Sequence, residues 1–293
     1  MQEWRMSEAL DLLVDLLDLE RIEDTTFRGR HPDRERERTF GGQVAAQALM
    51  AAGRTVQFGN VHSLHSYFLR PGDPSIPILY EVDRIRDGKS FTTRRVVAIQ
   101  HGKAIYNMQA SFHVDEESID HQIVMPDAPA PETIGRLADR IASEGGNLDE
   151  WSKRQHPIDQ RFVGELPWNT KRSRDPYQKI WIRADGDLPD DPLLHACVIT
   201  YASDMSLLDS VLAPHSIRWD DGTFMLASLD HCMWFHRTVK ADEWLLYSTE
   251  SPIAHGGRGV ARGFLSDEAG QLMISMVQEG LTRTIDPGKV KRT

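Results

Sequence analysis

The second half of this sequence repeats the first half in the same order, which restricts the chain to folds built from two similar units. Residues 200–208 resemble residues 39–47, and in both segments small residues lead into an apolar-periodic run that predicts the start of a helix. In this alignment Asp204 takes the place of Gln43. Three further pairs of segments match in order: residues 233–237 with 66–70, 256–262 with 88–94, and 270–279 with 102–111.

Each predicted unit combines one long apolar helix with an antiparallel sheet. Residues 8–17 show the spacing of an amphipathic helix, and residues 44–56 that of a buried helix. Strands are predicted after the buried helix, because runs rich in β-branched and aromatic residues alternate there with turn residues such as Pro and Gly. The predicted strands of the first unit are residues 61–69, 76–85, 90–100 and 103–114.

A long central helix wrapped by an antiparallel sheet is a hotdog, so the sequence predicts an α+β double hotdog. We expect an N-terminal hotdog in residues 1–115, a linker in residues 116–156 and a C-terminal hotdog in residues 157–293 that carries the catalytic residues. The linker is acidic and interrupted by prolines, with a short helix predicted at residues 133–141. Joining the two sheets edge to edge would remove two exposed strand edges and place a ligand site between the units.

Composition excludes several classes of protein. The formal charge of −10 argues against nucleic acid or an anionic membrane as the main partner, because phosphate binding depends on Lys and Arg. The longest apolar run has five residues, 48–52, which is too short to span a membrane. With only two cysteines in 293 residues, a disulfide framework is not expected, and a cytoplasmic location fits best.

Several familiar motifs are incomplete. Lys89 and Ser90 follow Gly88 as in a phosphate-binding loop, but the first glycine of that motif would fall on Asp83. No Gly-x-Ser-x-Gly segment occurs, which argues against a serine hydrolase of that type. The histidines lack the spacing of a metal site, so we expect no metal and no cofactor.

Three polar residues of the second unit form the candidate catalytic site. Asp204 lies at the predicted start of the second central helix, where unpaired N–H groups and the helix dipole favour an anion. Ser228 opens a predicted strand and Gln278 ends the last strand of the repeat. Such side chains, meeting across neighbouring elements, can orient one water molecule, although a helix cap is the commoner explanation for Asp204 taken alone.

The chain resembles the acyl-CoA thioesterase II family, whose members have the double-hotdog fold. The resemblance runs from about Leu10 to Arg283 and is carried by ordered segments: residues 27–30, 40–44, 62–74, 86–91, 203–204, 229–237, 243–247 and 277–280. It implies hydrolysis of fatty acyl-CoA to free fatty acid and CoA by a water molecule that Asp204, Ser228 and Gln278 orient. It also implies a homo-oligomer, a dimer or a tetramer.

For substrate binding we expect contributions from Gly42, Gln43, His65, Arg94 and Arg258. Gly42 permits close approach of the backbone, and arginines suit the phosphates of CoA. A solvated surface explains the arginines equally well.

Two other functions remain open at this level. An enoyl-CoA hydratase of the same fold pairs an Asp at the helix start with a His about five residues later, but Leu208 and Asp209 occupy that place here. A non-catalytic acyl-CoA-binding module is the second alternative, in which the three polar residues would be expected to be eroded.

Overall fold

Both halves of the chain contribute to one antiparallel sheet. The computed structural model describes residues 6–32, 38–143, 155–166, 173–217 and 224–285. Within these residues the sheet has thirteen strands, twelve of them in the order β1-β2-β4-β5-β6-β3-β10-β13-β12-β11-β8-β7, with β9 paired to β13. The first-half strands are β1 (Glu20–Glu23), β2 (Thr26–Gly29), β3 (Asn60–Phe68), β4 (Ile78–Asp87), β5 (Phe91–Gln100) and β6 (Lys103–His113). Those of the second half are β7 (Ile158–Phe162), β8 (Tyr177–Ala184), β9 (Phe224–Ser228), β10 (Asp230–Phe235), β11 (Leu245–His255), β12 (Arg258–Asp267) and β13 (Leu272–Thr284).

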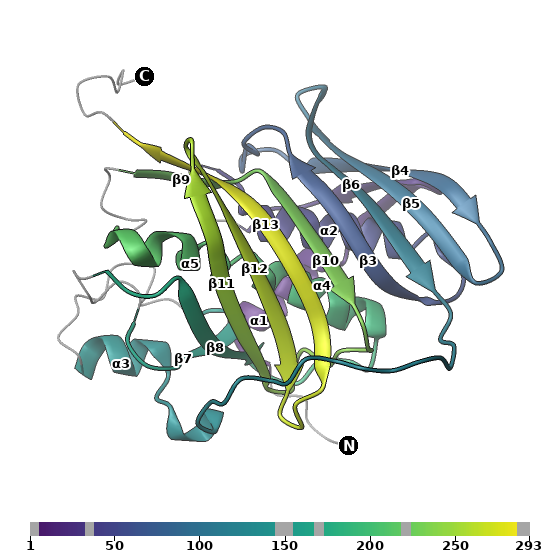
Figure 1. The fold of residues 1–293 in the computed structure, drawn as a ribbon. Coiled ribbons are helices and arrows are strands. Elements are labelled where there is room, and N and C mark those ends of the chain that lie inside the picture. The colour runs from purple at the N-terminus through teal and green to yellow at the C-terminus, as the bar shows by residue number, and fades with distance from the viewer. Residues whose placement is uncertain (1–5, 33–37, 144–154, 167–172, 218–223, 286–293) are drawn as a thin grey trace.

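The two half-sheets meet at strands β3 and β10, which run antiparallel with Leu64 opposite Met233 (Figure 1). This pairing satisfies the backbone groups that would otherwise form an exposed edge on each half. The predicted edge-to-edge fusion of two hotdog sheets is therefore confirmed.

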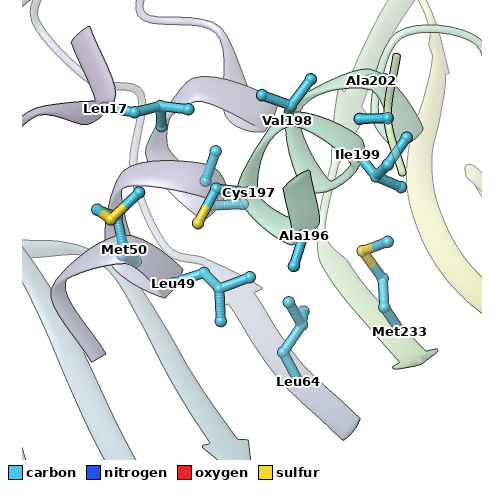
Figure 2. Close-up of a cluster of buried hydrophobic side chains, with 14 of the residues drawn as sticks. Leu17, Leu49, Met50, Leu64, Ala196, Cys197, Val198, Ile199, Ala202 and Met233 are labelled. Atoms are coloured by element: carbon cyan, nitrogen blue, oxygen red, sulfur yellow. The ribbon is translucent and has the colours of Figure 1, made fainter. Parts of the chain in front are cut away.

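The central helices α2 (Gly41–Gly53) and α4 (Pro192–Ser203) lie against each other on one face of the sheet (Figure 1). Figure 2 shows Leu49 and Met50 of α2 beside Ala196 and Cys197 of α4, above Leu64 of the sheet. Helix α2 is buried along nearly its whole length, because the sheet covers one side and α4 and α1 (Glu8–Leu17) cover others. Its many alanines permit this close packing.

The structure confirms the repeat in the sheet but not at the second helix. Gly102 and Gly270 make the matching β5–β6 and β12–β13 turns, with φ angles of 69° and 82°. The second central helix, however, begins at Pro192 and not near residue 200. The side chain of Asp191 caps it by accepting hydrogen bonds from the N–H groups of Leu193 and Leu194, and Pro192 suits the first helical position. This local start signal takes precedence over the weak similarity to residues 39–47.

The segment between β6 and β7 crosses the molecule near the β12–β13 turn. There Gln122 donates a hydrogen bond to the carbonyl of Gly270 and accepts one from the N–H of Leu272. The helix predicted at residues 133–141 is divided into a 3-10 turn, η1 (Pro131–Thr133), and α3 (Leu137–Ser143). A short helix α5 (Asp209–Leu212) and a second 3-10 turn, η2 (Ala213–His215), follow α4. None of the described helices is long and apolar enough to cross a membrane.

Arg94 stabilises the N-terminal half and is not available to a ligand. Its side chain on β5 is 2% exposed and donates hydrogen bonds to Thr55 and Asp87, as well as to backbone carbonyls. Thr55 follows the C-terminal end of α2, whereas Asp204 lies at the N-terminal end of that helix. The expectation that Arg94 contacts CoA is therefore wrong, because a sequence pattern does not show which end of the helix a strand residue reaches.

We predict that Arg94→Ala lowers the free energy of unfolding by about 3 kcal/mol, because it leaves several buried polar groups without their charged donor. Arg95→Ala is the matched control, since Arg95 is the next residue on the same strand, with an exposed side chain paired to the exposed Asp83. We expect a loss below about 1 kcal/mol for the control. If the two variants lose the same free energy of unfolding, measured in urea, the stabilising role assigned to Arg94 is contradicted.

Candidate active site

Asp204 caps the C-terminal end of α4, at the interruption between α4 and α5. The sequence prediction placed Asp204 at the start of the helix to which it belongs, and that prediction is wrong. A carboxylate at a helix C-terminus is disfavoured by the dipole of that helix. A compensating interaction must therefore come from another element.

That interaction comes from the N-terminus of α2. The N–H of Gly42 donates a hydrogen bond to the Asp204 carboxylate, and α2 has no side-chain cap of its own. A Cβ atom on Gly41 would lie 2.7 Å from Asp204 Oδ2, and one on Gly42 would lie 2.6 Å from the carbonyl oxygen of Tyr201. The pair of glycines therefore allows the helix terminus to approach the carboxylate.

Two side chains donate hydrogen bonds to one and the same oxygen of the Asp204 carboxylate. Ser228 Oγ lies 2.9 Å and Gln278 Nε2 lies 2.6 Å from Asp204 Oδ1. Ser228 is the last residue of β9 and pairs with Gly280 on β13, two residues from Gln278, so both side chains lie on the inner face of the sheet. Within the described part of the chain, Gln278 Oε1 is buried and has no hydrogen-bond partner, which leaves it available as an acceptor.

Burial raises the pKa of Asp204 above its ordinary value of 3.8. Hydrogen bonds from Gln278, Ser228 and Gly42, and the charge of Arg38, act in the opposite direction. The result is a carboxylate with more affinity for a proton than a solvated aspartate has.

Asp204 and Ser228 line a cavity of about 540 Å³ between the two halves. The start of α2, the end of β3, the start of β6 and the segment from Asp204 to Asp209 form its walls. Its apolar lining is contributed by Phe40, Val44, Phe68, Leu69, Ile105, Met205, Leu208, Leu226 and Leu229. Such a volume, mostly apolar with a few convergent polar groups, is typical of a small-molecule site.

Of the five residues predicted to bind substrate, only Gly42 contacts Asp204. Gln43 points away and donates to the carbonyl of Arg30. His65 is exposed and packs edge-on against Trp234, because strand alternation directs it away from the helices. Arg258 lies at the β11–β12 turn in an ion pair with Glu279. Neither His65 nor Arg258 lines the cavity, which is a correction to the sequence prediction.

The sequence prediction missed five polar residues of the cavity wall, which are Arg38, Thr39, Arg70, Tyr106 and Asp209. Arg38 and Arg70 occupy loops at its edge, and Tyr106 lies on β6. Arg70 belongs to the segment of residues 62–74 that carried the family resemblance, which was the available signal. In the part of the chain that the structure describes, no three His, Cys, Asp or Glu side chains gather to hold a metal ion.

Comparison with known proteins gives matches along both halves of the chain. The family profile described as "Acyl-CoA thioesterase N-terminal domain" matches residues 30–113, and the profile described as "Acyl-CoA thioesterase" matches residues 150–281. Human acyl-coenzyme A thioesterase 8 is 40% identical over 285 residues, which cover 93% of this chain and 89% of the relative. The chain belongs to the acyl-CoA thioesterase family.

Other members of the family agree over nearly the same length. Acyl-CoA thioesterase 2 of Haemophilus influenzae is 37% identical over 289 residues, covering 95% of this chain and 99% of the relative. The crystal structure of acyl-CoA thioesterase II TesB2 from Mycobacterium marinum superposes with a TM-score of 0.77 at 41% identity, covering 94% of this chain and 99% of that chain. A hot dog fold protein from Alicyclobacillus acidocaldarius, at 19% identity and a TM-score of 0.76, supports the fold alone.

The cavity of this acyl-CoA thioesterase contains a second carboxyl group. Asp209 begins α5 and lines the cavity together with Asp204. Burial raises the pKa of Asp209 from 3.8 to about 7, opposed by the charge of Arg174. The folded protein therefore holds a proton on Asp209 that the unfolded chain releases above pH 3.8, and stability falls as pH rises from 3.8 through about 7.

We predict that Asp209→Asn removes this loss of stability. At pH 8 the variant should melt roughly 5 °C above the wild type, and at pH 4 the difference should nearly vanish. Asp115→Asn, at an exposed position, is the control and should leave the melting temperature unchanged at both pH values. A difference of the same size at pH 4 and pH 8 would show that the ionisation of Asp209 is not the cause.

Proposed function

We propose that this chain hydrolyses fatty acyl-CoA thioesters to free fatty acid and CoA, with Asp204 as the base. Membership of the acyl-CoA thioesterase family supports the reaction class. The observation that carries the proposal is the convergence of Ser228 and Gln278 on one oxygen of Asp204, at the wall of the cavity between the halves.

The chemistry follows from the side chains. A thioester carbonyl carbon is electrophilic and a thiolate leaves readily, so a positioned water molecule can attack without a covalent enzyme intermediate. The water oxygen bonds to the carbonyl carbon while its proton passes to Asp204. The C–S bond then breaks, and the thiolate takes up a proton to give CoA and the free acid. The raised pKa of Asp204 favours this proton transfer.

Ser228 and Gln278 hold Asp204 in place while Gln278 also orients the water. Both donate to Asp204 Oδ1, which fixes the direction of the carboxylate. Gln278 Oε1, which has no hydrogen-bond partner among the described residues, can accept a hydrogen bond from the water. The carbonyl oxygen of the substrate is received by an N–H group in the first turn of α2, where such groups lack intrahelical partners.

One such site per chain is proposed, because the opposite junction of the central helices differs. There the N-terminus of α4 is capped by its own Asp191, and Leu193 packs beside Gly53 of α2. The residue that caps the C-terminal end of α2, in the place matching Asp204, is Arg54. A cation in that place cannot act as a base.

We predict that Asp204→Asn lowers kcat by about two to four orders of magnitude, because it removes the base while keeping the side-chain shape. Ser228→Ala and Gln278→Ala should each lower kcat by about two to three orders of magnitude. Ser228→Thr is the matched control, since it keeps the hydroxyl group and should keep most of the activity. Release of free thiol from acyl-CoA, followed with a colour reagent, measures each variant.

Near-normal thiol release by Asp204→Asn would refute the assignment of the base. In the wild type, kcat/KM should fall as pH is lowered through the pKa of Asp204, which lies above 3.8. Hydration of an enoyl-CoA without thiol release would favour the hydratase alternative, and tight binding without turnover would favour the binding module.

The homo-oligomer that the resemblance implies remains a prediction, to be measured by light scattering.

A further inference from the structure

Two loops at the cavity edge are joined so that Arg38 and Arg70 share one opening. The N–H of Thr39 donates a hydrogen bond of 2.9 Å to the carbonyl of Gly72. Arg38 Nη2 lies 3.0 Å from the carbonyl oxygen of Leu226, and Arg70 Nη1 lies 2.6 Å from that of Ala104. Leu226 lies on β9 and Ala104 on β6, so these hydrogen bonds hold the two guanidinium groups at the wall of the cavity that contains Asp204.

These two arginines carry their charges at the edge of the cavity, where the charge of Arg38 also acts to lower the pKa of Asp204. Both side chains are exposed, and no carboxylate among the described residues lies in ion-pair contact with either. Other arginines considered for CoA binding are paired: Arg94 with Asp87 and Arg258 with Glu279. In a chain of net charge −10, two guanidinium groups at one opening, neither in an ion pair with a carboxylate of the described residues, form a local site for an anion.

Thr39, which lies where the two loops are joined, offers a further hydrogen-bond donor. Its side chain is 9% exposed, and Thr39 Oγ1 has no hydrogen-bond partner among the described residues. A Cβ atom on Gly72 would lie 2.8 Å from this oxygen, so the glycine keeps the space beside it open. A buried hydroxyl group without a partner is costly unless a ligand or water satisfies it.

We propose that Arg38, Thr39 and Arg70 form an anion subsite that binds the phosphates of CoA, a proposal that rests on the proposed function. Each arginine uses one guanidinium nitrogen for a backbone carbonyl and keeps other N–H groups for phosphate oxygens. The pantetheine arm then extends from this opening toward Asp204. The subsite makes the chain select thioesters by the phosphates of their carrier.

The test compares one acyl group on two carriers, CoA and phosphate-free pantetheine. The measured quantity is the ratio of kcat/KM for acyl-CoA to kcat/KM for acyl-pantetheine. We expect Arg70→Ala and Arg38→Ala each to lower this ratio about tenfold, and Thr39→Val to lower it less. Arg258→Ala is the matched control, because it removes an exposed arginine outside the cavity, and it should keep the wild-type ratio.

Calorimetric titration with CoA itself gives a second measurement that does not depend on hydrolysis. Weaker CoA binding in Arg38→Ala and Arg70→Ala, with wild-type binding in Arg258→Ala, supports the subsite. An unchanged ratio together with unchanged CoA affinity in both variants overturns it, while thiol release from either substrate leaves the proposed function standing. If no substrate is hydrolysed, the proposed function fails, and the CoA titration still decides whether the arginines bind the anion.

Discussion

The carboxylate of Asp204 connects the two central helices of the molecule at their ends. It stands at the C-terminal end of α4, where a negative charge is unfavourable, and accepts a hydrogen bond from the first turn of α2, where a negative charge is stabilised. Gly41 and Gly42 leave room for this contact. The candidate site therefore exists only when the two halves are packed together, and the joined sheet of β3 and β10 maintains that packing.

In a duplicated fold the ends of the two central helices lie close together at two places, and in this chain the two places carry different residues. At one end α2 lacks a side-chain cap and depends on Asp204 from the other half. At the other end α4 is capped by its own Asp191. The capped end satisfies its N–H groups locally, so it has no need of a charged partner. The difference gives an asymmetric site on a nearly symmetric scaffold.

The two helices and strands β3 to β6 of the first half were predictable because their signals are local, whereas the short strands β1 and β2 were not predicted. Strands β3 to β6 lie within about two residues of the predicted ranges, since period-two alternation follows directly from packing on one face of a sheet. The second central helix was predicted too late in the chain, because weak similarity to residues 39–47 was given more weight than the start signal at Asp191 and Pro192. The three polar residues proposed for catalysis do come together, although Asp204 was chosen for a place at a helix start that it does not have, and all three for their match to the family.

The sequence by itself determined the repeated unit, the alternation of its strands, the small residues that let α2 pack closely, and the presence of Asp204, Ser228 and Gln278 in one half. Only the tertiary structure decided that Asp204 meets the start of α2, that Arg94 is enclosed at the other end of that helix, and that Arg38 and Arg70 share one opening. Periodicity and capping residues report contacts within a few positions of the chain. Contacts between the halves depend on how two finished units pack, and no local pattern encodes that arrangement.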